Sequence, residues 1–297
     1  MPGITSQTEL TAVVGFTLPD GRLDHDPEVY LTYDKSRSRP TESLRLAVED
    51  LRPRIDSEHL PAPSEQLFRQ GYALARHRCD FLDAIPSQDG TQAYLDQTAE
   101  AMKQWLECSR VIAWNSVVRR NDPAQVQLKE VEQQKEPEKD FVPTSRLQPI
   151  AGVAHVDQDA GWGKELCKRA IGKDVDEVKR AMIVNTWRPL HGPVTNAPLA
   201  VCSFENLEEG DISRHASQFG VGLDIHHNPK QAWGYIRHQM PDEVILLKCY
   251  DSLQGKDGSA LYCGHVAVQV DGDDEGIAQE LVKPRESIEV RLVAVWE

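Results

Sequence analysis

The second half of this 297-residue chain is divided into short apolar runs, and that pattern constrains the fold more than any other feature. Turn-forming residues such as Gly, Pro, Asn and Asp separate the runs, which is typical of strands in an all-β sandwich or barrel. The sequence therefore predicts a double-sheet jelly roll or barrel, which can bring side chains from separate strands to one mouth. The runs are 153–157, 181–187, 199–204, 233–236, 243–250, 260–268 and 287–295.

The first half combines helices and strands. Residues 11–16 and 111–118 are predicted as strands, and residues 94–108 carry one apolar stripe that predicts a helix packed against a sheet. A helix is also predicted for residues 42–51, because apolar side chains recur there at helical spacing. The predicted fold class is therefore mainly β with flanking helices (α+β).

Composition excludes some classes of function. The formal net charge is −14, which argues against a nucleic-acid binder and against a protein that binds anionic membranes. No apolar run reaches a membrane-spanning length, and Met1–Thr5 lacks the basic and apolar segments of a signal peptide. The six cysteines form no Cys-x-x-Cys pair, which favours reduced thiols. We expect a cytoplasmic protein without a membrane or nucleic-acid partner.

The run 153–157 contains His155 and Asp157, two residues apart. Residues i and i+2 of a strand point to the same face, so both side chains are candidates for ligands of one metal ion. The best candidate for a third ligand is His265, in the run 260–268. Two histidines and one carboxylate with open positions form the facial triad of non-haem iron(II) oxygenases.

Arginines near the C-terminus are candidates for binding a dicarboxylate cosubstrate. A guanidinium group holds a carboxylate bidentately, and a nearby hydroxyl can add a hydrogen bond. Arg285 follows His265 in the sequence and Ser287 lies two residues further on, so this pair is the first choice for 2-oxoglutarate. Arg291 remains a rival, because it shares the face of Arg285 if the strand is regular.

Several runs of the sequence resemble the family that includes the fungal gibberellin desaturase and a component of cephamycin methoxylation. The resemblance covers roughly residues 65 to 296. It implies a double-stranded β-helix (a cupin-like jelly roll), with iron(II) bound by His155, Asp157 and His265, and 2-oxoglutarate bound by Arg285 with the help of Ser287. The matching runs are 72–77, 155–157, 184–190, 192–194, 233–235, 241–244, 248–252 and 287–291.

What the resemblance implies is an iron(II)/2-oxoglutarate-dependent dioxygenase that uses molecular oxygen to hydroxylate, desaturate or ring-close a small secondary-metabolite substrate. Asn185 and Arg188 are candidates for lining the cofactor or substrate pocket, with turn and core roles as the alternative. A non-redox metal- or ligand-binding jelly-roll accessory protein remains a second class of function, and a metal-dependent hydrolase or isomerase a third. A homo-oligomer also remains open.

The domain organisation follows from the same patterns. We expect one oxygenase domain over residues 1–297, with a helical or mixed N-terminal part at 1–120 and the metal-binding jelly-roll core at 145–297. The Ser-, Arg- and Pro-rich stretch 36–41 is predicted as a loop, either solvated or a lid over the site. The charged stretch 121–140 is predicted as a surface loop or a short exposed helix.

Overall fold

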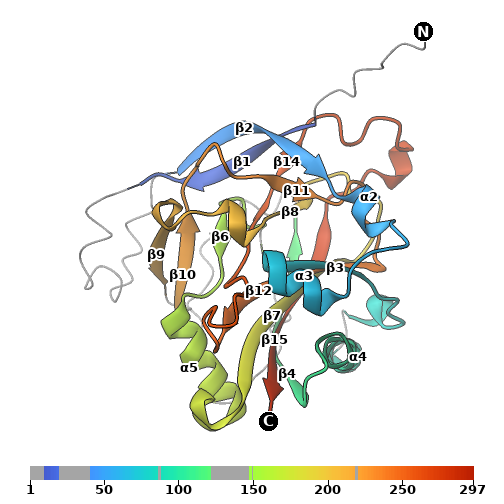
Figure 1. Ribbon diagram of the computed structural model, residues 1–297. Coiled ribbons are helices and arrows are strands. Elements are labelled where there is room, and N and C mark those ends of the chain that lie inside the picture. The colour runs from blue at the N-terminus through green and yellow to red at the C-terminus, as the bar shows by residue number, and fades with distance from the viewer. Residues whose placement is uncertain (1–9, 20–40, 86–87, 122–146, 149, 218–219) are drawn as a thin grey trace.

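The computed structural model describes residues 10–19, 41–85, 88–121, 147–148, 150–217 and 220–297. In this part of the chain, two β-sheets pack against each other and helices cover the outside (Figure 1). The predicted class, mainly β with flanking helices, is confirmed. The predicted loops at 36–41 and 121–140 fall almost entirely outside the described residues.

The larger sheet has nine strands in the order β14-β1-β2-β11-β8-β13-β6-β10-β9. Its neighbouring strands pair antiparallel except for β2 and β11, which run parallel. Because β6 lies between β13 and β10, residues distant in sequence become neighbours there. The strand bounds are β1 Thr11–Thr17, β2 Thr41–Asp50, β6 His155–Val156, β8 Leu199–Cys202, β9 Ile212–Ser217, β10 Gly220–Ile225, β11 Trp233–Tyr235, β13 Gly264–Ala267 and β14 Gln269–Val270.

The smaller sheet has six strands in the order β3-β12-β7-β15-β4-β5. Its central strands β7 and β12 are buried along almost their whole length, as expected for strands covered on both faces. The last strand, β15, pairs with both β7 and β4. The bounds are β3 Tyr72–Arg76, β4 Arg110–Arg120, β5 Leu147–Gln148, β7 Arg180–Pro189, β12 Glu243–Asp251 and β15 Glu286–Trp296.

The helices pack against the smaller sheet and at one end of the sandwich. Helix α4 (Gln88–Leu106) buries the predicted apolar stripe, with Leu95 and Met102, against the outer face of the smaller sheet. Helix α5 (Ala160–Ile171) begins at Asp159, whose side chain accepts a hydrogen bond from the backbone N–H of Trp162. The remaining helices are α2 Arg52–Ile55, α3 Pro63–Gln70 and the 3₁₀ turns Leu82–Ala84, Val175–Glu177, Phe204–Asn206, Glu209–Asp211 and Gln279–Leu281.

The predicted helix at 42–51 is wrong, because these residues form strand β2. Leu44, Leu46 and Val48 are two residues apart, so a strand brings all three to one face, where they pack on the core of the larger sheet. Apolar residues in this stretch also recur at helical spacing, so the sequence pattern alone fits both a helix and a strand. Pairing with β1 and β11 selects the strand.

Between the sheets, the interior is apolar on one side and polar on the other. Trp187 and Leu247 of the smaller sheet pack against Val201 and Cys263 from the larger one. Elsewhere, the inward positions of the smaller sheet carry polar groups, among them Asn185. This polar region is where the candidate site lies.

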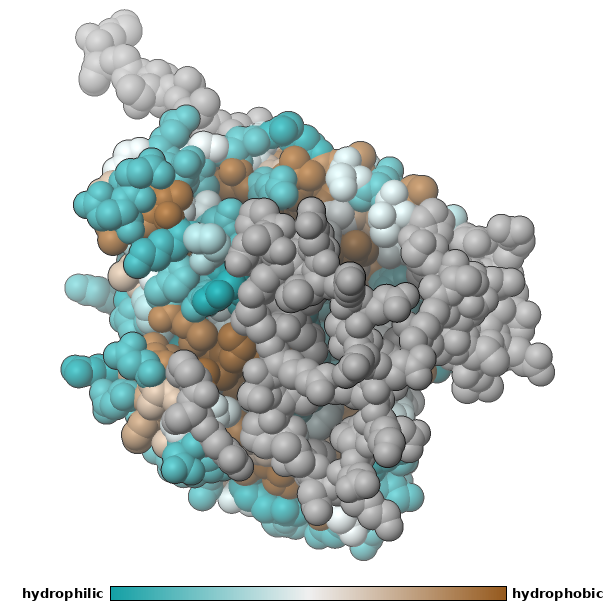
Figure 2. Space-filling view, turned by 180° about the vertical axis from the view of Figure 1, so that it is seen from behind, coloured by the Kyte–Doolittle hydropathy of each residue, from teal (hydrophilic) through white to brown (hydrophobic). Residues whose placement is uncertain are grey.

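The described surface is mixed in character. On the face shown in Figure 2, hydrophilic residues lie beside a smaller hydrophobic area. Among the described residues, the large apolar side chains that are exposed are Phe68, Phe81, Met240 and Leu281. None of the helices in the described ranges is both long enough and apolar enough to cross a membrane.

Candidate active site

Two neighbouring strands bring the predicted metal ligands together. His155 in β6 and His265 in β13 are directly opposite each other in an antiparallel pair, so their side chains extend from the same face of the sheet. Their ring centroids are 4.3 Å apart. Asp157 immediately follows β6, and the ligand atoms of all three residues lie within 4.8 Å of one another.

The distances suit a shared metal ion. Oδ1 of Asp157 is 3.5 Å from Nε2 of His155 and 3.8 Å from Nε2 of His265. Ligands bound to one metal at about 2.1 Å lie roughly 3 to 3.5 Å apart, so small side-chain movements would complete the coordination. Nε2 of His265 is buried and makes no hydrogen bond within the described part of the chain. The donor set therefore fits a divalent transition metal.

The surroundings favour the ligating forms of these side chains. Nδ1 of His155 is 2.7 Å from the carbonyl oxygen of Val153, so a proton on Nδ1 leaves the Nε2 lone pair for a metal. Burial, followed by the charge of His155, lowers the pKa of His265 to about 3, so this imidazole is neutral at pH 7. Burial opposes ionisation of Asp157, but its hydrogen bond with His155 and the charge of Arg291 hold its pKa well below the usual range.

For His155 itself, two effects oppose each other. Burial lowers its pKa, but the hydrogen bond to Asp157 and the negative charge of that carboxylate raise it, and the net direction is upward. A proton therefore competes with a metal ion for His155 more strongly than for His265.

The smaller sheet supplies the groups that surround Asp157. Nδ2 of Asn185 donates to Oδ2 of Asp157 at 2.5 Å and lies 3.5 Å from Oε1 of Glu289. Arg291 lies opposite Asn185 in the β15–β7 pair, and its Nε is 3.3 Å from Glu289. Arg291 is therefore already engaged with a carboxylate.

Arg285 and Ser287 lie further along the same edge and are buried. Nη1 of Arg285 donates to the carbonyl oxygen of Ala197 at 2.5 Å, and its guanidinium lies 5.4 Å from the ring centroid of Trp187. Nε of Arg285 and Oγ of Ser287 are buried and have no hydrogen-bond partner in the described ranges. Burial, followed by repulsion from Arg119, lowers the pKa of Arg285 to about 9, so a bound anion would stabilise this guanidinium.

Arg188 is not brought together with these residues. It extends from the other face of β7, where its guanidinium donates to the carbonyl oxygens of His77 and Pro241. Its other terminal nitrogen is 2.6 Å from Nδ1 of His77, and the guanidinium lies over the ring of Tyr94 in helix α4. Arg188 thus lies among buried residues of the helix-covered face, away from the three candidate metal ligands.

Glu289 and Arg119 belong to the polar region but were not singled out from the sequence. Oε2 of Glu289 is 4.0 Å from Nε of Arg119, and burial together with the charge of Asp157 raises the pKa of Glu289. Arg119 lies opposite Ser287 in the β4–β15 pair. The available signal was the alternation of polar residues along 287–291, which places Glu289 on the inward face between Ser287 and Arg291.

The group of His155, Asp157 and His265 is open on one side. His155 and Asp157 line a hollow of about 340 Å³ together with His215, Leu223 and Asp224. The side chains of His155 and Asp157 are 23% and 11% exposed, whereas that of His265 is 4% exposed. Small molecules can therefore approach the group from the side of β6 and β10.

A jelly roll that presents two imidazoles and a carboxylate beside an open hollow defines a class, the double-stranded β-helix metalloproteins. Residues 22–295 match the family model described as "Oxidoreductase/YMDC permease-like domain". The match covers most of the chain, and the chain belongs to this family.

Relatives of known name agree with this placement. The chain is 37% identical over 124 residues to aspirochlorine biosynthesis protein N of Aspergillus oryzae (40% of this chain, 49% of that protein). It is 34% identical over 128 residues to the gibberellin cluster GA4 desaturase of Gibberella fujikuroi (40% of this chain, 35% of that protein). The matched region is thus half or less of the length of these two relatives.

A solved structure supports the fold. The iron and alpha-ketoglutarate-dependent endoperoxidase NvfI superposes with a TM-score of 0.69 at 20% sequence identity, over 98% of this chain and 99% of that one. The predicted jelly-roll fold is confirmed. The resemblance to the gibberellin desaturase family and the expected class of enzyme, an oxidoreductase, are confirmed as well.

Proposed function

We propose that this protein is an iron(II)/2-oxoglutarate-dependent dioxygenase that hydroxylates, desaturates or ring-closes a small secondary metabolite. The observation that carries the proposal is the group of His155, Asp157 and His265, whose ligand atoms lie within 4.8 Å of one another. The names of the relatives, a desaturase and an iron-dependent endoperoxidase, support the same chemistry. Molecular oxygen would be the second cosubstrate.

Iron(II) would be held by Nε2 of His155, Oδ1 of Asp157 and Nε2 of His265, leaving positions for 2-oxoglutarate and oxygen. When bound, iron and 2-oxoglutarate supply the oxidising power for attack on an unactivated C–H bond. The protein's part is to hold the ligands and exclude competing reactions. Asn185 would fix the second oxygen of Asp157, which keeps the carboxylate from rotating.

The distal carboxylate of 2-oxoglutarate would be held by Arg285, with Ser287 as a second donor. Support comes from the buried Nε of Arg285 and the buried Oγ of Ser287, which lack partners within the described residues. A carboxylate would satisfy both and would neutralise a buried cation. The rival, Arg291, already pairs with Glu289 and assists Asp157 electrostatically.

The test uses iron binding and 2-oxoglutarate turnover. We expect purified protein to bind iron(II) and to convert 2-oxoglutarate to succinate, and expect His155→Ala to abolish both while the fold is retained. His59→Ala, at an exposed histidine, is the matched control and should behave as the wild type. Full activity in His155→Ala would refute the site. Iron binding without any succinate, including with candidate metabolites, would favour the non-redox accessory protein.

We further propose that residues 1–297 form a single domain, with the N-terminal part, residues 1–120, built into the core formed by residues 145–297. Strands β1 and β2 pair within the larger sheet and β3 and β4 within the smaller one, which supports this proposal. One calorimetric unfolding transition is the expected result.

A cytoplasmic location is also proposed. All six cysteines are free in the structure, as expected in a reducing compartment. Fractionation of cells that produce a tagged chain would test the location.

A further inference from the structure

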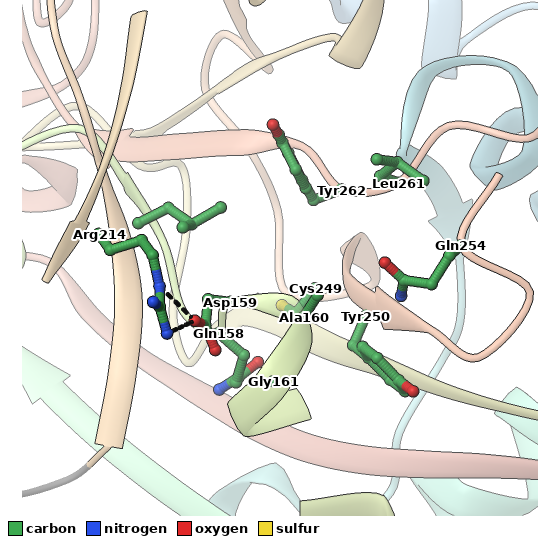
Figure 3. Close-up of a pocket in the computed structure, with 11 residues that line it drawn as sticks. Gln158, Asp159, Ala160, Gly161, Arg214, Cys249, Tyr250, Gln254, Leu261 and Tyr262 are labelled. Atoms are coloured by element: carbon green, nitrogen blue, oxygen red, sulfur yellow. Dashed lines mark hydrogen bonds and ion pairs between the residues drawn. The ribbon is translucent and has the colours of Figure 1, made fainter. Parts of the chain in front are cut away.

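A second pocket, of about 410 Å³, opens at the end of the sandwich beside the N-terminus of helix α5 (Figure 3). Side chains from β9, β10 and β12 and from the segment that follows β12 form its walls. The volume lies in the range of pockets that hold small organic ligands. Its lining residues are Gln158, Asp159, Ala160, Gly161, Arg214, Leu223, Cys249, Tyr250, Gln254, Leu261 and Tyr262.

The pocket adjoins the candidate metal ligands. Gln158 directly follows Asp157, and Leu223 lines both this pocket and the hollow that contains His155 and Asp157. The thiol of Cys249 lies close enough to Asp157 that, after burial, the charge of that carboxylate raises the thiol pKa further. None of the three candidate metal ligands lines the pocket itself, so an occupant that is oxidised must extend from the pocket past Leu223 into the hollow that contains His155 and Asp157.

The charged lining residues are already paired with each other. Oδ2 of Asp159 accepts a hydrogen bond from Nε of Arg214 at 2.7 Å and forms an ion pair with its Nη2 at 2.5 Å (dashed lines in Figure 3). Oδ1 of Asp159 accepts from the backbone N–H of Trp162 at 2.7 Å. Both carboxylate oxygens are thus engaged, and a charged ligand would have to compete with an existing ion pair. The pocket favours an uncharged occupant.

The rest of the lining is apolar except for two carboxamides, two tyrosine hydroxyls and the thiol of Cys249. Leu223, Leu261 and the rings of Tyr250 and Tyr262 provide apolar surface. Gln158 is 5% exposed, and its Oε1 is buried without a hydrogen-bond partner among the described residues. A buried acceptor of this kind costs free energy unless it gains a donor, and because the oxygen is not accessible from the pocket, the carboxamide would rotate to meet a donor on an occupant.

We propose that this pocket binds the substrate, and that the substrate is an uncharged, largely apolar molecule with a hydroxyl or amide N–H that donates to Gln158. The inference rests on the proposed function, because it identifies the pocket's occupant with the molecule to be oxidised. It restricts the substrate class to neutral, largely apolar compounds with few polar groups and disfavours carboxylates and phosphates.

The test uses three probes that share the naphthalene ring system. 2-Naphthol donates a hydrogen bond, naphthalene does not, and 2-naphthoate is an anion. Binding is measured by calorimetry on the full-length protein with iron(II) and 2-oxoglutarate, without oxygen, so that the cosubstrate site is filled. We expect 2-naphthol to bind about fivefold more tightly than naphthalene, as one hydrogen bond provides, and more tightly than 2-naphthoate.

Two sets of variants locate the binding. In Gln158→Leu, the preference for 2-naphthol over naphthalene should disappear. Leu261→Trp, which fills the pocket, should weaken binding of 2-naphthol about tenfold or more, and the milder Leu261→Phe should have a smaller effect. Leu281→Trp, at an exposed leucine in a different segment, is the control and should change nothing.

Any of three results would overturn the inference: tightest binding of 2-naphthoate, an unchanged preference for 2-naphthol in Gln158→Leu, or Leu261 variants that bind as the wild type does. In any of these cases, iron and 2-oxoglutarate binding in the same samples would leave the proposed function intact. If iron(II) and 2-oxoglutarate fail to bind, the proposed function is wrong. The probe titrations then still test the pocket independently.

Discussion

Replacement of Arg285 by glutamine tests which arginine anchors 2-oxoglutarate. Arg285 is 2% exposed, and its guanidinium forms no ion pair with a carboxylate among the described residues. An incoming carboxylate would therefore accept hydrogen bonds from N–H groups that are not yet paired. Each charge-assisted hydrogen bond contributes about 1.5 to 3 kcal/mol. Loss of a bidentate contact should therefore cost about 3 kcal/mol, which is about a hundredfold in the dissociation constant.

The assay compares 2-oxoglutarate with 2-oxopentanoate, which has the same chain length but lacks the distal carboxylate. Both are titrated into iron(II)-loaded protein without oxygen, and the ratio of the two dissociation constants isolates the contribution of that carboxylate. The wild type should prefer 2-oxoglutarate by about a hundredfold. Arg285→Gln should lose this preference, whereas Arg291→Gln should keep it even where overall affinity falls, because Arg291 acts on Glu289 and Asp157.

Stability is measured in parallel, because Nη1 of Arg285 also donates to the carbonyl oxygen of Ala197. Loss of that buried hydrogen bond should lower the free energy of unfolding by about 1 to 3 kcal/mol, and titrations are therefore run well below the unfolding temperature. A preference that survives in Arg285→Gln and disappears in Arg291→Gln would show that the anchor has been assigned to the wrong arginine.

The remaining predictions concern metal affinity and pH. Because the pKa of His155 is raised, iron(II) affinity should fall about tenfold per pH unit as pH drops below that pKa and stay constant above it; a pH-independent affinity would contradict the ligand assignment. Asn185→Leu removes the hydrogen bond to Asp157 and should weaken iron(II) binding about 10- to 100-fold in equilibrium dialysis. Thr186→Val, a buried neighbour on the opposite face whose hydroxyl has no partner in the described ranges, should leave metal affinity unchanged. Burial and a neighbouring arginine lower the pKa of His77 to about 4, so the unfolded chain binds the extra proton between about pH 6.5 and 4. Stability should therefore fall by about 2 kcal/mol as pH drops through that window, and chemical denaturation of His77→Gln should show a smaller fall.

Much of the candidate site could be proposed from the sequence because its chemistry lies in short sequence patterns. His155 and Asp157 are two residues apart, and a strand or an extended segment places such a pair on one side whatever the rest of the fold does. His265 was the best candidate for the third ligand because it lies in a later strand-like run. The structure brings these three residues together through the β6–β13 pair.

Other features depended on pairing between distant strands. The stretch 42–51 satisfies a helical and a strand pattern at once, and only its neighbours β1 and β11 make it a strand. Arg188 belongs to a run that matches the family, yet its position in β7 points it to the helix-covered face. Glu289 and Arg119 join the site because β4, β15 and β7 lie side by side.

The sequence by itself determined the strand-rich class, the type of metal ligand and the pair of residues around which the candidate site forms, because these depend on local alternation and side-chain chemistry. Only the tertiary structure decided which of the two arginines is paired with a carboxylate, which polar residues surround Asp157 and where an apolar pocket opens. Those properties depend on burial and on which strands are neighbours, and contacts between separate segments of the chain, such as Asn185 with Asp157 and Arg285 with Ala197, set both.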